Sequence, residues 1–233
     1  MGLPKIDLPI FELTLPSTGE VLKYRPFTVK EEKILLVAQQ DDNPEQTIVA
    51  IKQIANNCLL DKDISDIPMF DLEYILLVLR ARSVDNTVKF TITDPDTEEP
   101  VELELNLDNV TVTKDPEHTN EVAINEEYKL ILKYPSIDEF IKITALEEGD
   151  PLGSYFIMVS CLDYVASDDE VHYFKNYTQK EIDDFMEDTS ADVVKGIQKF
   201  FETMPKLRHE IKYKNNQGED KTFVVEGIRS FFS

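Results

Sequence analysis

The spacing of apolar residues changes twice along this 233-residue chain, and the change constrains the fold more than any other feature. From about residue 28 to residue 83, apolar side chains recur at helical intervals. From Val84 to about residue 133 they alternate with polar residues, as they do in strands, and from Ser136 the helical spacing returns. Helices and strands in separate segments are typical of an α+β fold.

Each end of the chain predicts a β-hairpin. Near the N-terminus, residues 10–15 and 20–24 alternate on either side of a turn at 16–19. Near the C-terminus, residues 209–213 and 222–225 do the same around a turn at 215–218. We therefore expect an α+β protein with a helical body, N- and C-terminal β-hairpins and a central strand-rich insertion.

Helix-start signals locate most of the expected helices. Capping boxes begin at Thr28, Ser136 and Thr178, and Pro44 stands at a first helical position. Ser190 begins a last long helix that Pro205 ends. The expected helices are 28–37, 44–59, 69–82, a helix after 136, 155–165, a helix after 178, and 190–204.

The same spacing suggests a division of the chain. Residues 1–83 form the N-terminal hairpin with helices, 84–133 form a strand-rich lobe, and 134–233 form a helical region with the C-terminal hairpin. We expect the first and third segments to pack together as one body, with the lobe distinct from it.

The chain is strongly acidic, with 46 Asp and Glu against 24 Lys and Arg and a formal net charge of -22. Such a surface repels phosphate, so neither nucleic acid nor an anionic membrane surface is an expected partner. Two interpretations remain for the acidity itself. It provides solubility, or it suits a basic partner.

Cysteine usage and targeting signals point to a protein made in a cytoplasm. Cys58 and Cys161 lie in apolar stretches, so buried free thiols in a reducing compartment are expected. The sequence begins without a signal-peptide pattern and contains no run of about 18 apolar residues that would cross a membrane.

Residues that could carry chemistry do not form a recognised motif. The acidic stretch 61–66 resembles a calcium loop, but Asp66 and Leu72 occupy the positions of the required Gly and Glu. Residues 168–172 could supply metal ligands, or they form an acidic loop before an aromatic segment. The sequence thus predicts no catalytic residue, no cofactor and no metal. An enzyme such as a hydrolase remains a third hypothesis beside the two binding roles given below.

Two adjacent aromatic pairs have two interpretations each. Neighbouring residues on a helix point about 100° apart. One member of Phe200 and Phe201, or of Phe231 and Phe232, can therefore enter the core while the other faces elsewhere. The pairs either belong to a wide buried face or provide a contact for a partner, because aromatics are enriched in interface cores.

Several segments, in order along the chain, match a known family. They are residues 15–19, 24–33, 68–74, 80–84, 200–207 and 225–232. Together they resemble the baseplate hub subunit family of T-even-type contractile-tailed phages. Some members of that family carry Cys-x-x-Cys pairs in the strand-rich block. Here the corresponding turn, residues 94–99, has no thiol, so a structural zinc is not expected.

The resemblance implies a non-enzymatic structural or assembly protein that acts through contacts with other phage baseplate or tail proteins. It implies a location in the virion tail baseplate, or in the host cytoplasm during assembly. A second role stays open, that of a tail-assembly chaperone for the tape-measure protein that is absent from the mature virion.

Candidate interface residues follow from these matching segments and from the aromatic pairs. They are Arg25, Phe27, Phe70, Tyr74, Phe201, Phe231 and Phe232. A buried ion-pair cluster is also expected, in which Arg25, Glu31 and Glu32 lie close to Arg80 and Arg82 and tie the N-terminal hairpin to the third helix.

Overall fold

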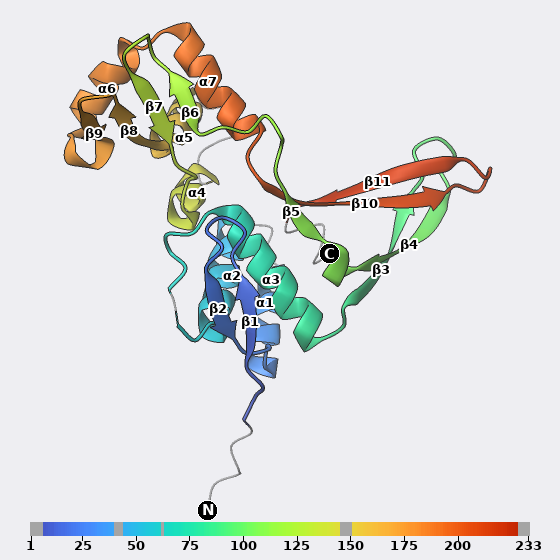
Figure 1. Ribbon diagram of the computed structural model, residues 1–233. Coiled ribbons are helices and arrows are strands. Elements are labelled where there is room, and N and C mark those ends of the chain that lie inside the picture. Colours follow the sequence, from blue (N-terminus) through green and yellow to red (C-terminus); the bar gives the residue numbers. More distant parts are fainter. Residues whose placement is uncertain (1–6, 40–43, 62, 145–150, 228–233) are drawn as a thin grey trace, which may run out of the picture. The chain divides into compact units, whose positions relative to one another are not determined.

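The computed structural model describes residues 7–39, 44–61, 63–144 and 151–227 (Figure 1). Contacts divide the chain into two compact units. Unit 1 comprises residues 1–113 and 206–233, and unit 2 comprises residues 114–205. Unit 2 is therefore an insertion within unit 1 in the order of the sequence.

The helical part of unit 1 begins with a hairpin of β1 (Phe11–Thr14) and β2 (Val21–Tyr24). The helices α1 (Val29–Gln39), α2 (Pro44–Cys58) and α3 (Met69–Ser83) follow. The turn of the hairpin is fixed to the start of α3, because Ser17 donates from its backbone N–H, at 3.0 Å, and from its hydroxyl to the buried Asp71 carboxylate.

Helix α3 is the centre of this core. Leu72, Ile75, Leu76 and Leu79 are fully buried, at the helical spacing that the sequence shows. The end of α2 is joined to β2, because the Arg25 N–H donates to the Cys58 carbonyl at 2.9 Å. Hydrogen bonds therefore tie the hairpin to both α2 and α3.

The remaining strands of unit 1 form two small antiparallel sheets. Strands β3 (Thr87–Thr93) and β4 (Pro100–Asn106) pair with each other. After the short helix η1 (Leu107–Asn109), β5 (Thr111–Thr113) pairs with β10 (Lys206–Lys214), which pairs in turn with β11 (Asp220–Glu226). The β3–β4 turn bonds to the other sheet through Tyr213, whose hydroxyl donates to Asp94 at 2.7 Å.

Unit 2 has one antiparallel sheet in the order β6-β7-β8-β9. Its strands are β6 (Glu121–Ala123), β7 (Lys129–Leu132), β8 (Leu162–Ala166) and β9 (Val171–Tyr173). Its helices are α4 (Ile137–Thr144), α5 (Pro151–Ser160), η2 (Phe174–Asn176), α6 (Gln179–Glu187) and α7 (Ala191–Glu202). Sheet and helices enclose a core that includes Leu130, Cys161, Ile197 and Phe200.

The structure confirms the α+β class and both terminal hairpins. It also confirms the expected helix starts at Ser136, Thr178 and Ser190, and the Thr178 capping box is complete. The expected helix over 155–165 is wrong in its second half. That helix ends at Ser160, and Leu162–Ala166 is a strand between β7 and β9. The apolar run fits both spacings, and pairing with distant strands decides between them.

The two compact units do not have the limits that the change in apolar spacing suggests. Strands β3, β4 and β5 fall in unit 1, whereas β6 and β7 fall in unit 2. The reason is strand pairing, because β5 pairs with β10 while β7 pairs with β8. These partners lie far away in the sequence, so alternation alone does not reveal them.

Candidate functional site

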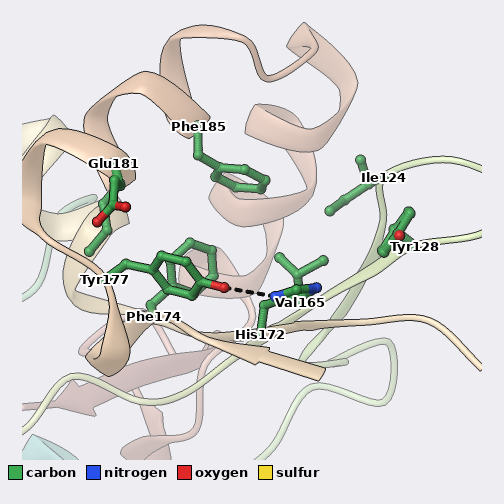
Figure 2. A pocket seen from close by; sticks show the side chains of 9 residues that line it. Ile124, Tyr128, Val165, His172, Phe174, Tyr177, Glu181 and Phe185 are labelled. Atoms are coloured by element: carbon green, nitrogen blue, oxygen red, sulfur yellow. Dashed lines mark hydrogen bonds between the residues drawn. The ribbon is translucent and has the colours of Figure 1, made fainter. Parts of the chain in front are cut away.

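An apolar concavity lies in unit 2, between one face of the sheet and α6, and has a volume of about 430 Å³ (Figure 2). We call it the α6 pocket. The sheet side contributes Ile124, Tyr128, Val165 and His172, and η2 with α6 contributes Phe174, Tyr177, Glu181, Ile182 and Phe185. Figure 2 shows the Phe185 ring facing the sheet residues across the open space.

Side chains in β8 and β9 point alternately to the two faces of the sheet, so cross-strand partners face the pocket together. Val165 and His172 are cross-strand partners, so both face α6. The next pair, Tyr164 and Tyr173, faces the opposite side of the sheet, with ring centroids 5.1 Å apart. The hairpin thus divides its residues between a pocket face and an outer aromatic face.

Helix α6 forms the other wall because of its capping and its apolar face. Thr178 accepts from the Glu181 N–H, and the Glu181 carboxylate accepts from the Thr178 N–H at 2.8 Å and hydroxyl at 2.7 Å. Ile182 and Phe185 then lie three residues apart on one helix face. The hydrogen bonds from Thr178 lower the pKa of Glu181, so the mouth of the pocket carries a negative charge at neutral pH.

A small polar network borders the apolar floor. Glu170 accepts from the Tyr128 hydroxyl at 2.7 Å and lies 3.2 Å from Nε2 of His172. The other ring nitrogen of His172 lies 2.7 Å from the Tyr177 hydroxyl. The bond from Tyr128 is the main reason why the pKa of Glu170 is lowered. The network fixes the imidazole and both phenols at the edge of an otherwise apolar surface.

The chemistry of this arrangement favours binding. Its lining is mostly aromatic and aliphatic, and a few polar groups stand at one edge, as in sites that hold an apolar group in a fixed orientation. Among the residues that the structure describes, no group of three or more His, Cys, Asp or Glu side chains is placed to hold a metal ion.

The predicted interface residues lie in different environments. Arg25 forms an ion pair with Glu31, at 3.1 Å, and its side chain is 23% exposed. Phe70 is buried at 4% exposure, whereas Phe27 and Tyr74 are partly exposed. Phe231 and Phe232 lie outside the described residues.

The expected cluster around Arg25 is found in part. Arg25 and Glu31 pair, but the described partners of Arg82 are different. Its guanidinium lies 5.8 Å from the centre of the Phe11 ring. A link from this region to α3 comes from Phe27, whose N–H donates to the Ser83 hydroxyl at 2.7 Å.

Phe200 and Phe201 divide between the core and its edge. Phe200 is 2% exposed, and Phe201 is partly buried with its ring centroid 5.7 Å away. His118 also packs on Phe200, and its two ring nitrogens each lie 2.9 Å from a hydroxyl, of Thr203 and of Tyr134. Burial lowers the pKa of His118, so this ring is a neutral part of the packing.

The two cysteines are free and buried, as expected. Burial raises the pKa of the Cys58 thiol to about 11 and that of Cys161 to about 12. Both are therefore protonated at neutral pH and act as small apolar core groups.

A second exposed apolar surface lies on α1. Val29, Leu36 and Val37 are 66%, 54% and 69% exposed. Their separations of seven and eight residues place them on one face of the helix, which we call the α1 face. An apolar stripe that is exposed on a helix is a common protein contact surface.

The sequence interpretation missed the α6 pocket. It assigned 162–165 to a helix and 168–172 to a loop, so the pocket-facing pair of Val165 and His172 was not recognised. A usable signal was present, because Val171, His172 and Tyr173 alternate after a polar turn, and Ile182 and Phe185 follow a complete capping box.

The comparison with family models decides the family. The model described as T4 bacteriophage base plate protein matches residues 8–233, nearly the whole chain. The chain belongs to this family. No curated protein and no solved structure matches it. This T4-type phage baseplate protein has, in its described part, no helix long and apolar enough to cross a membrane. Membership indicates a structural role among other tail or baseplate proteins.

Proposed function

We propose that this baseplate protein is a non-enzymatic structural or assembly component of the central hub and acts through protein–protein contacts. The observation that carries the proposal is the ordered series of segments that resemble hub subunits, within a chain that the base plate family matches over residues 8–233. The hub position is the part of the proposal that rests on the resemblance.

Several of these segments contact one another in unit 1. The segment 15–19 bonds to 68–74 through Ser17 and Asp71. The segment 24–33 bonds to 80–84 through Phe27 and Ser83, and it contains the pair of Arg25 and Glu31. The matching residues therefore define how hairpin and helices are joined, which supports a shared scaffold with the hub subunits.

Exposed apolar surfaces support a role in binding. The α1 face places Val29, Leu36 and Val37 in solvent, and Phe27 and Tyr74 are partly exposed in the same unit. A few apolar or aromatic anchors usually provide most of the affinity of an interface. Of the predicted interface residues, we propose Phe27, Tyr74 and Phe201 as contacts. Arg25 is engaged in its ion pair with Glu31 and Phe70 is buried, and Phe231 and Phe232 remain proposals without a described position.

Quantitative mass spectrometry of purified virions tests the role. We expect the protein in fixed stoichiometry with other baseplate proteins. Absence from virions, together with its presence in infected cells, would favour the alternative, a chaperone for the tape-measure protein that leaves before maturation. The acidic composition suits either role, because a high net charge favours solubility and an acidic surface attracts basic partners.

Two variants of equal exposure test the α1 face. Val37 and Val84 are each 69% exposed, but only Val37 lies on that face. We expect Val37→Asp to lower incorporation into virions, or capture of the assembly partner, while Val84→Asp leaves both unchanged. Equal behaviour of the two variants would count against the α1 face as a contact.

A further inference from the structure

We propose that the α6 pocket binds one large apolar side chain, presented by a positively charged segment of a partner protein. This rests on the proposed function as a protein that acts by contacts, and it adds a site and the chemistry of its occupant.

The size and lining of the pocket fit such an anchor. Its volume is about 430 Å³, whereas a cavity of about 150 Å³ is enough to hold benzene. Val165, Ile182 and Phe185 are the apolar lining residues. The Tyr177 hydroxyl points to His172, to which it is hydrogen-bonded (Figure 2). A Phe, Leu or Met side chain therefore fits with its backbone left outside.

The carboxylates around the pocket favour a positive charge on the partner segment that carries this anchor. Glu181 lines the pocket itself, and Glu170 bonds to two lining residues, Tyr128 and His172. The pKa of Tyr128 is raised chiefly by its bond to Glu170. Burial of the hydroxyl and the charges of Glu127 and Asp169 raise the pKa of Tyr128 further.

The net negative charge of unit 2 also favours a positively charged partner segment. Residues 114–205 contain 21 Asp and Glu against eight Lys and Arg, a net charge of -13. Lys175 has its Nζ 5.2 Å from the Tyr173 ring, which lies on the outer face of the sheet. The negative charge of unit 2 therefore attracts Lys and Arg beside the anchor. It provides no electrostatic attraction to a neutral segment and repels an acidic one.

Defined peptides on the intact chain test the proposal. The probes are Ac-Gly-Lys-Lys-Phe-Lys-Lys-Gly-NH2, the same peptide with Ala for Phe, and the same peptide with Glu for each Lys. Methyl NMR signals of Ile124, Val165 and Ile182 report occupancy of the pocket. We expect saturable shifts with the first peptide, an affinity about tenfold or more lower when Ala replaces Phe, and no saturable shift with the Glu peptide.

Matched variants separate the anchor from the charge. Tyr177 lines the pocket and Tyr173 does not, although their exposures are alike at 41% and 40%. Tyr177→Ala should weaken binding of the basic Phe peptide, and Tyr173→Ala should not.

The charge is tested by a second pair of variants. Glu170→Gln with Glu181→Gln keeps side chains that accept hydrogen bonds and removes two charges. This variant should weaken binding several-fold at low salt and flatten its salt dependence, whereas Asp192→Asn with Glu202→Gln on α7 should not.

Other outcomes overturn the proposal. Binding of N-acetylphenylalanine amide as strongly as the basic peptide would assign the pocket to a small apolar ligand. Self-association in sedimentation, abolished by Tyr177→Ala, would assign it to a second copy of this chain. If no peptide shifts the methyl signals, the pocket proposal is rejected. The hub role is not affected by that result, because the recovery of the protein in virions tests it independently.

Discussion

At the residue scale, the pair of Arg25 and Glu31 joins the N-terminal hairpin to α1. The guanidinium donates to both carboxylate oxygens, at 3.1 and 3.3 Å, and Glu31 is 1% exposed. The carboxylate also accepts from the Thr28 N–H at 2.9 Å and from its hydroxyl. The carboxylate bond to the Thr28 N–H is one half of a capping box, and here the same carboxylate has a cation as a second partner.

We expect Arg25→Ala to reduce the free energy of unfolding by about 2–4 kcal/mol, because it leaves a buried carboxylate without its cation. Arg208→Ala is the matched control, since Arg208 pairs with Glu210 and Glu226 on an exposed strand. That change should cost only about 0–1 kcal/mol. Urea unfolding of both variants measures the difference, and equal losses would mean that the Arg25 pair is no stronger than a surface pair.

Stability should also depend on pH through Glu31. Hydrogen bonds and the Arg25 charge outweigh burial and lower its pKa from 4.5 to about 2. A lowered folded-state pKa gives stability that is present above pH 4.5 and is lost as the pH falls towards 2. A shift of this size corresponds to about 3 kcal/mol. Urea unfolding of the wild type and Glu31→Gln between pH 2 and 6 should converge at the acid end; a constant difference would contradict the assignment.

At the scale of elements, helix α7 approaches strand β6 closely at a glycine. A Cβ on Gly196 would lie 2.5 Å from Cγ1 of Val122 and 3.1 Å from Cγ2. Val122 is buried and β-branched, so its methyl groups cannot easily move away. The contact therefore requires glycine although the residue lies inside a helix.

Gly196→Ala should destabilise unit 2. The crowding costs about 1–3 kcal/mol, which exceeds the gain of up to about 1 kcal/mol in helix propensity. Val122→Ala removes the obstructing methyl groups, so the double variant should be more stable than the sum of the two losses predicts, by about 0.5–3 kcal/mol. Thermal unfolding of the four proteins completes the cycle, and strictly additive losses would show that the two residues do not meet.

The elements also show what the sequence could predict. Local signals were sufficient for the hairpins and for the capped helices, because turns and capping boxes involve residues three or four apart. The strand β8 and the α6 pocket depend on pairing between Ile131 and Tyr164, and between Val165 and His172. The apolar run 155–166 satisfies helix and strand alike, so only the distant partner selects the strand.

At the scale of the whole molecule, the chain leaves unit 1 at the end of β5 and returns at the start of β10. Thr113 and Lys206 are cross-strand partners, and the Thr113 hydroxyl donates to the Lys206 carbonyl at 3.4 Å. The two ends of unit 2 are therefore adjacent. Insertions with adjacent ends are tolerated well, because the host fold does not need to stretch to receive them.

We predict that residues 114–205 fold as an isolated fragment. Its core is formed entirely by residues of that segment, including Leu130, Val193 and Phe200, and about 90 residues suffice for a small independent core. The fragment should unfold cooperatively by circular dichroism. Residues 84–133, the lobe suggested by the change in apolar spacing, provide the comparison. That fragment should remain unfolded, because β5 loses its partner β10 and β7 loses its partner β8. If the 84–133 fragment unfolded cooperatively and the 114–205 fragment did not, the domain limits suggested by apolar spacing would be favoured over the two units defined by contacts.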